Sequence, residues 1–250
     1  MYLLDHLVHF VEKPERLVET TKELGLHTVS GGRHEMWGTY NSLCYFGLSY
    51  IEFIGIFDLG LFEVSAREPF TLHETYKKKD YQNSVLRIAL RTNKIDEVAH
   101  HLASDGYEVY GPKDFSRTRP DGSVIKWKLL HFGKENQKID FPFIIQWDGD
   151  DKARYKELVE IGTIKPHQLG NLQITEIEFE LEDLSIPLEW GRVFDFEVTG
   201  TESYKQVKLP NCMLTFKETM GTNKIAQVNI SGADREKKVE IEGTTYLFQT

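Results

Sequence analysis

Apolar and polar positions alternate in most of the N-terminal part of the chain, and one stretch replaces this alternation with a helical period. Residues 3–11 alternate as a β-strand does, and the pattern ends at Lys13. From Pro14 to Gly25 the apolar side chains recur every three or four residues, which predicts a helix that begins at proline and ends at glycine. Three β-rich runs separated by glycines follow, at residues 27–32, 38–47 and 49–57.

The same order of patterns recurs at an offset of 81 residues, which aligns Gly25 with Gly106. Residues 84–92 are typical of a strand, and residues 94–106 have a helical period. The strands predicted after that helix cover residues 107–119, 124–133 and 141–147, with a turn at Pro120-Asp121-Gly122. A repeat of this length favours two copies of one βαβββ unit.

The C-terminal part of the chain is less regular. Residues 148–170 are charged and hold one short helical pattern, at 150–162, which is typical of a connector. Further β-rich runs lie at residues 172–183, 204–218, 224–232 and 238–249, with a short segment around 188–194. We therefore predict an α+β protein of tandem βαβββ units whose curled mixed sheets form a cup. Residues 1–150 form the paired domain, and residues 151–250 add the connector and a third, less regular βαβββ-like unit. The pattern leaves open which units pair.

Composition and charge narrow the range of partners. A hydrophobic content of 40% is sufficient for a large core, and a net charge of −9 without a basic run argues against nucleic acid. The N-terminal apolar run contains Asp5 and two histidines, unlike a signal peptide, and no stretch of about 18 apolar residues is present to cross a membrane. Cys44 and Cys212 are isolated, which fits a reducing cytoplasm. The expected partner is a small molecule.

Several motifs in this order are similar to those of one known family. The first unit begins with LDHLVHFV at residues 4–11 and ends with YIEFIGI at 50–56; between and after them are GGRHEMWGTYNSLCYF, SRTRPDG and PFIIQW. Over residues 4–147 the chain resembles the glyoxalase-like domain family of the vicinal oxygen chelate superfamily, which includes glyoxalases and extradiol dioxygenases. The resemblance implies a cup that holds a divalent metal on side chains from the first and last strand of each unit.

Two histidines on the first strand are alternatives for a place in this cup. Because side chains alternate along a strand, His6 and His9 are expected to face opposite sides, with Asp5 on the side of His9. Both sides are largely apolar, so the pattern alone does not choose between them. In the family that the chain resembles, the histidine directly after an aspartate is commonly the ligand, which implies His6. His9 is then expected to pack against the helix layer or to bond a backbone group.

Glu52 lies on the last strand of the same unit, where a carboxylate is costly to bury unless it is paired, hydrogen-bonded or bound to metal. His6 and Glu52 are therefore the predicted catalytic and metal-binding residues. Imidazole and carboxylate ligands suit Zn, Fe, Mn or Ni, and a bound ion would stabilise an enolate or activate oxygen. Glu52 acting as a general base is the alternative.

The second unit offers no equivalent pair of ligands. The offset of 81 residues places Arg87 where His6 stands, and an arginine does not bind a cation because it stays protonated. Near the place of Glu52, the last strand of the second unit offers Gln146 or apolar residues, and Gln146 supplies only an amide oxygen. His34 or His131 would have to complete the ligand set through a loop that folds over the cup. The metal prediction therefore rests on an incomplete site.

Eight residues are candidates for contact with the ligand. They are His34, Asn41, Arg87, Arg91, Arg117, Arg119, Trp127 and Gln146. The arginines would bind a carboxylate or phosphate through paired hydrogen bonds. Other interpretations remain open: His34 and Asn41 lie in a run that also fits a turn into a strand, Arg117 and Arg119 fit a solvated hairpin end, and Trp127 fits the core. His73, near a run of lysines, is predicted to lie at the surface.

These residues support two functions of different classes. The first is an enzyme, a metal-dependent lyase, isomerase or dioxygenase that acts on an anionic or oxygen-chelating molecule. The second is a module that binds or sequesters a small molecule without chemistry, as antibiotic-resistance members of the superfamily do. The aromatic residues Tyr45, Phe46, Trp127 and Trp147 and the incomplete second half of the site favour it. A homodimer or partner-binding scaffold that uses the C-terminal unit is a third hypothesis.

Overall fold

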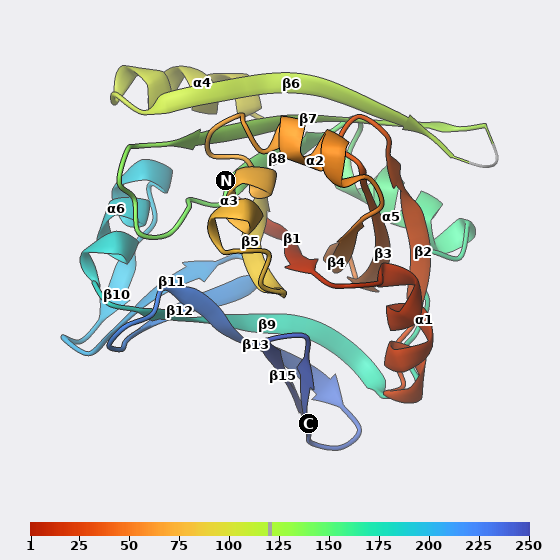
Figure 1. The fold of residues 1–250 in the computed structure, drawn as a ribbon. Helices are drawn as coiled ribbons and strands as arrows, with labels where there is room; N and C mark the ends of the chain where they lie inside the picture. The colour runs from red at the N-terminus through yellow and green to blue at the C-terminus, as the bar shows by residue number, and fades with distance from the viewer. Residues whose placement is uncertain (120–121) are drawn as a thin grey trace.

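The chain forms two curled β-sheets that pack against each other (Figure 1). In this computed structural model, residues 1–119 and 122–250 are described, and Pro120 and Asp121 of the predicted turn lie outside them. The N-terminal sheet, red to green in Figure 1, curls around a hollow, and the C-terminal sheet, cyan to blue, lies against its outer side. The predicted α+β class is confirmed.

The first sheet has the strand order β2-β3-β4-β1-β5-β8-β7-β6. Its strands are β1 (Leu3–Phe10), β2 (Thr28–His34), β3 (Thr39–Phe46), β4 (Ser49–Ile56), β5 (Ser84–Arg91), β6 (Glu108–Thr118), β7 (Val124–Gly133) and β8 (Phe143–Trp147). Helix α1 (Pro14–Glu23) follows β1, and helix α4 (Ile95–Ser104) follows β5. Strand β1 pairs parallel with β4 and antiparallel with β5, and β5 pairs parallel with β8. The first βαβββ unit therefore pairs with the second.

The second sheet repeats this arrangement in shortened form, with the order β10-β11-β12-β9-β13-β15-β14. Its strands are β9 (Gly170–Leu181), β10 (Val198–Gly200), β11 (Tyr204–Leu209), β12 (Cys212–Glu218), β13 (Lys224–Ala233), β14 (Lys237–Ile241) and β15 (Thr244–Gln249). Helix α6 (Ser185–Phe194) follows β9, so β9 to β12 form a complete third unit. Strands β13 to β15 take the places of β5, β7 and β8 and have no helix. The sequence predicted one irregular unit here, and the structure divides it into a complete third and a shortened fourth.

Apolar side chains from both sheets fill the space between them. Leu7 and Ile88 from the first sheet and Ile177 and Phe179 from the second are at most 1% exposed and belong to one cluster. Val8, next to Leu7, belongs to a separate cluster on the hollow side of the first sheet. The alternation of β1 therefore supplies one face to the core between the sheets and the other to the hollow.

Two short helices, α2 (Leu59–Ser65) and α3 (Leu72–Lys78), lie between the first two units and extend over the hollow (Figure 1). Asp58 caps α2 by accepting a hydrogen bond from the Leu61 amide at 3.0 Å, and Thr71 caps α3. The sequence analysis did not predict these helices, because seven residues are too few for a helical period to stand out. The connector helix α5 (Asp151–Glu160) was predicted and lies at the rim of the hollow.

His9 packs against the second sheet and not against the helix layer. Its Nδ1 lies 2.7 Å from the Tyr246 hydroxyl, and its Nε2 lies 3.2 Å from the Glu242 carbonyl. Burial lowers the pKa of His9 to about 4, although the hydrogen bond to Glu242 raises it in part. The ring is therefore neutral near pH 7. Sequence alone could not show this contact, because the partners come from the far end of the chain.

Replacing Tyr246 with phenylalanine is expected to lower the free energy of unfolding by about 1–3 kcal/mol, because the Nδ1 of His9 then loses its partner in a buried place. Urea unfolding monitored by fluorescence measures the change. The matched control is Tyr204→Phe, since Tyr204 is 37% exposed and the structure gives its hydroxyl no hydrogen bond. Equal stability of the two variants would contradict the role assigned to the hydroxyl.

Candidate functional site

A β-bulge in β1 places Asp5 and His6 together. Leu4 pairs with Leu90 and His6 pairs with Ala89, so Asp5 has no partner across the β1–β5 ladder. The extra residue turns the strand, and the Asp5 carboxylate reaches the Nδ1 of His6 at 2.7 Å. The prediction that Asp5 and His6 face opposite sides was wrong, because strict alternation fails at a bulge.

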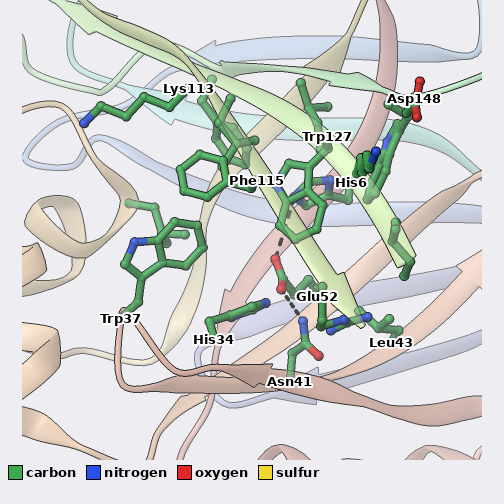
Figure 2. Close-up of a pocket in the computed structure, with 18 of the residues that line it drawn as sticks. His6, His34, Trp37, Asn41, Leu43, Glu52, Lys113, Phe115, Trp127 and Asp148 are labelled. Carbon is green, nitrogen blue, oxygen red and sulfur yellow. Dashed lines mark hydrogen bonds and ion pairs between the residues drawn. The ribbon is translucent and has the colours of Figure 1, made fainter. Parts of the chain in front are cut away.

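The other nitrogen of His6 faces Glu52. The distance from His6 Nε2 to Glu52 Oε2 is 3.7 Å, and Asn41 Nδ2 donates to Glu52 Oε1 at 2.5 Å (Figure 2). His6 and Glu52 are only 4% and 9% exposed. The Tyr50 ring stacks on the His6 ring at 4.6 Å, which fixes its plane. Asp5, His6, Glu52 and Asn41 therefore form one buried polar chain.

Two arginines and a tryptophan contact the second oxygen of the Asp5 carboxylate, the one that does not bond to His6. Asp5 Oδ2 accepts a hydrogen bond from Trp147 Nε1 at 3.0 Å and lies 3.4 Å from Arg154 and 3.7 Å from Arg91. Burial alone would raise the pKa of Asp5, but the hydrogen bond with His6 and the charges of Arg154 and Arg91 outweigh it and hold the pKa below its usual value. Asp5 is therefore a buried, ionised carboxylate.

Three members of the polar chain, His6, Glu52 and Asn41, lie in the wall of a cavity of about 730 Å³ in the hollow of the first sheet, and Asp5 contacts His6. Most of the wall is apolar, as is typical of a site for a small molecule. The aromatic residues of the wall are Trp37, Tyr45, Tyr50, Tyr110, Phe115, Trp127, Phe143 and Trp147. Figure 2 shows Trp37, Phe115 and Trp127 on one side of Glu52. Helices α2, α3 and α5 supply further residues of the wall, so segments outside the repeated units complete the cavity.

His34 lies near Glu52 in the same cavity (Figure 2). Its Nδ1 is 3.0 Å from the Thr39 hydroxyl. Burial lowers the pKa of His34; the Glu52 charge opposes this change, and the Arg117 charge adds to it. Arg117 packs over Gly32, where any side chain would collide with its guanidinium. It forms no ion pair with a described residue, so it adds an uncompensated positive charge to the cavity wall.

The structure brings most of the predicted ligand contacts into this cavity. Its wall includes His34, Asn41, Arg117, Arg119 and Trp127 beside His6 and Glu52. Arg119 is paired with Glu157 of α5, so the hairpin end is tied to the connector helix.

Three predicted contacts, Arg87, Arg91 and Gln146, are absent from the part of the wall that the structure describes. Arg91 pairs with Asp151 and Asp5, and Gln146 accepts a hydrogen bond from the Ile95 amide at the start of α4. Arg91 and Gln146 therefore stabilise the structure around the site. Arg87 lies under α3, where its Nε and Nη1 donate to the carbonyls of Phe141 and Phe70.

The register of the second unit decides between the two alternatives for the position equivalent to Glu52. Val8 pairs with Glu52 in β4, and Ala89, 81 residues after Val8, pairs with Phe143 in β8. The apolar alternative therefore holds, because Phe143 stands in the place of Glu52. The second half of the cup combines Arg87 with an aromatic ring, which makes it unlike the first half.

Several residues of the site were missed in the sequence. Asp5 and Arg154 were not selected, because only the bulge and the packing of α5 bring them to His6. His73 was predicted to lie at the surface, which was wrong: it is 5% exposed, lines the cavity and contacts Trp37 and Phe62. Burial lowers its pKa to about 3. Its partners come from the turn before β3 and from helix α2, so the lysines next to it in the sequence do not indicate its surroundings.

Comparison with known proteins identifies the family of this chain. The sequence profile of the glyoxalase-like domain matches residues 4–191. The chain belongs to the glyoxalase-like domain family. The solved structure of a hypothetical protein from Staphylococcus aureus superposes on this glyoxalase-like chain with a TM-score of 0.89 at 23% identity, over 100% of both chains.

A more distant structure shares the fold. A xylose isomerase-like TIM barrel/4-hydroxyphenylpyruvate dioxygenase fusion protein aligns with a TM-score of 0.54 and 14% identity, over 92% of this glyoxalase-like chain and 36% of that protein. At these identities the likeness shows the fold alone. No curated protein matches the sequence. None of the described helices is long and apolar enough to cross a membrane.

The donor set of this glyoxalase-like chain does not fit the divalent metal that members of the superfamily often use. Within residues 1–119 and 122–250, no group of three or more His, Cys, Asp or Glu side chains could hold a metal ion. His6 and Glu52 supply two donors, but Arg87 and Phe143 occupy the opposite half of the cup, and neither binds a cation. The chemistry of the cup is therefore derived from its own side chains.

Proposed function

We propose that this protein binds a small molecule with an apolar body and a carbonyl group in the cup, and that His6 and Glu52 move a proton on that molecule. The observation that carries the proposal is the separation of 3.7 Å between His6 Nε2 and Glu52 Oε2. This is too long for a direct hydrogen bond, so each of the two atoms is left to contact a ligand, at about 2.8 Å for a hydrogen bond. The pair is thus arranged to act on two neighbouring atoms of a carbonyl compound.

The neighbours of the pair support this role. Asp5 engages the Nδ1 of His6, so Nε2 is the nitrogen left for a ligand, and Asn41 engages Oε1 of Glu52, so Oε2 is the free oxygen. Glu52 would remove a proton from the carbon beside the carbonyl; the electron pair of that C–H bond would form a C=C bond, and the π pair of the carbonyl would move to its oxygen. His6, as an imidazolium with a proton on Nε2, would give that proton to the oxygen. Reversal of these transfers returns the carbonyl compound, so the net result is isomerisation or hydrogen exchange.

The test follows hydrogen exchange at that carbon. A thermal-shift screen of small aromatic and 2-oxo acids identifies molecules that stabilise the fold. Exchange of the C3 hydrogens of phenylpyruvate and of 2-oxobutanoate in D₂O is then followed by NMR with the wild type and with Glu52→Gln. We expect the variant to lose at least about 100-fold of the protein-dependent exchange rate, as is typical of a removed general base. Addition of EDTA should leave the wild-type rate unchanged.

Glu157→Gln is the matched control, because Glu157 also lines the cavity but is paired with Arg119 at the rim. It should keep the wild-type exchange rate. Exchange by Glu52→Gln at the wild-type rate would contradict the proposal, and loss of exchange in EDTA would point to a metal that binds in another way.

The second candidate function is binding without chemistry. The observation that favours it is the aromatic wall, which includes Phe143 in the place equivalent to Glu52. Micromolar binding of an aromatic acid by the wild type, unchanged in Glu52→Gln and without hydrogen exchange, would support a sequestering module instead.

A further inference from the structure

The far end of the cup contains buried polar atoms that lack partners. In the described part of the chain, Arg87 Nη2, His73 Nε2 and His131 Nδ1 are buried and have no hydrogen-bond partner. Such atoms are rare in folded proteins, because burying a polar group without a partner is unfavourable. Three of them in one region therefore indicate a missing partner.

Several contacts bring these three residues together. The Arg87 guanidinium lies 5.9 Å from the centre of the Phe143 ring, and the His131 ring stacks on the same ring at 5.4 Å. Arg87 also donates to the Phe70 carbonyl, three residues before His73. Burial lowers the pKa of His131 most, and the nearby charges of Arg87, His73 and Lys113 lower it further. His73 and His131 line the cavity, so the region is open to a ligand through them.

The charge of Arg87 has no counterion in contact. Arg87 is 2% exposed, and no described carboxylate lies within ion-pair distance of it. Asp140 and Glu74 stabilise its charge only from further away. A buried cation without a contacting anion is unfavourable. An anion beside Nη2 would compensate the charge and satisfy the free N–H together.

We propose that Arg87, His73 and His131 form an anion subsite that takes the carboxylate of the ligand. A neutral imidazole can donate one N–H, so the three side chains offer one charged and two neutral donors. Within the subsite, Arg87 stands at the position of the second unit that is equivalent to His6.

The subsite also defines the shape of the ligand, and this step rests on the proposed function. The His6 ring contacts Phe143 at 5.4 Å, so Phe143 lies between the His6–Glu52 pair and the subsite. The ligand is then a carboxylic acid that lies over Phe143, with its carboxylate at the subsite and its carbonyl at His6 and Glu52.

Formate binding tests the subsite without any need for proton transfer. Thermal-shift titrations with sodium formate at constant ionic strength are run in the Arg117→Met background, so that the free arginine of the wall does not contribute. We expect saturable stabilisation in this background, and a Kd about ten-fold or more weaker when Arg87→Met or the pair His73→Phe and His131→Phe is added. Addition of Glu52→Gln should leave the formate Kd unchanged, which separates this test from that of the proposed function.

A measurement on the wild type tests the subsite even if the variants fail to fold. Crystals of the wild type soaked in sodium bromide should show an anomalous peak within hydrogen-bond distance of Arg87 Nη2 and at least one of the two imidazoles. Absence of that peak, or a formate Kd that is unaffected by both sets of substitutions, would overturn the proposal.

Discussion

Asp5→Asn is expected to lower the free energy of unfolding by about 3–5 kcal/mol, the usual cost of removing one partner from a buried ion pair. Asp5 is 0% exposed and faces His6, Arg91 and Arg154. Its loss would leave two arginines, each with a side chain about 10% exposed, without their buried counterion. Urea unfolding at pH 7, analysed by linear extrapolation, measures the change.

Asp151→Asn is the matched control for this prediction. Asp151 pairs with Arg91 at 2.9 Å, but its side chain is 46% exposed, so its contribution should be about 0–1 kcal/mol. A loss below about 1 kcal/mol for Asp5→Asn would show that the arginines find water when Asp5 is gone, and the network would then not be a structural centre.

Acid is expected to destabilise the fold well before the carboxylates titrate. His9 and His73 have pKa values of about 4 and about 3 in the folded protein, against 6.5 for an ordinary histidine. Below pH 6.5 the unfolded chain therefore binds protons that the folded chain does not, and stability falls as the pH falls. These two groups alone give a slope of about 2.7 kcal/mol per pH unit between roughly pH 6 and 4, and His34 and His131, whose pKa values burial also lowers, add to it. Urea midpoints measured over pH 7.5–4.5 test this.

The variant His73→Phe should reduce this slope by about one proton, because it removes one of the buried neutral histidines. His100→Gln is the control, since His100 is exposed and should leave the slope unchanged. Asp5 acts in the same direction at lower pH: its folded pKa lies below the usual value, so the stability that it contributes is lost as the pH falls through that range. A flat stability profile from pH 7.5 to 4.5 would contradict the burial of neutral histidines.

In the second sheet, polar side chains at the positions equivalent to the site bond to one another. In the register of β9 with its neighbours, Glu176 stands where His6 does, and Thr215 stands where Glu52 does. Thr215 and Asn229 both donate to the Glu176 carboxylate, at 2.5 and 2.7 Å. These polar groups satisfy one another, which is the opposite of the open pair and the unpartnered atoms of the first sheet.

The sequence by itself determined the units of the first sheet and one half of the site. The helices at Pro14–Glu23 and Ile95–Ser104 have strong local signals, and the offset of 81 residues identified their repetition. Glu52 stood out because a carboxylate in an apolar strand needs a partner. These inferences depend on periodicity and burial, which neighbouring residues carry.

Only the tertiary structure decided what surrounds His6 and how the cup is closed. The bulge at Asp5, the register that brings Phe143 to the place of Glu52, and the approach of Arg154 from α5 all depend on pairing between distant segments. His73 reached the cavity for the same reason, although it lies beside lysines. Local patterns do not encode such contacts, because register and packing are set by the whole sheet and by the helices that cover it.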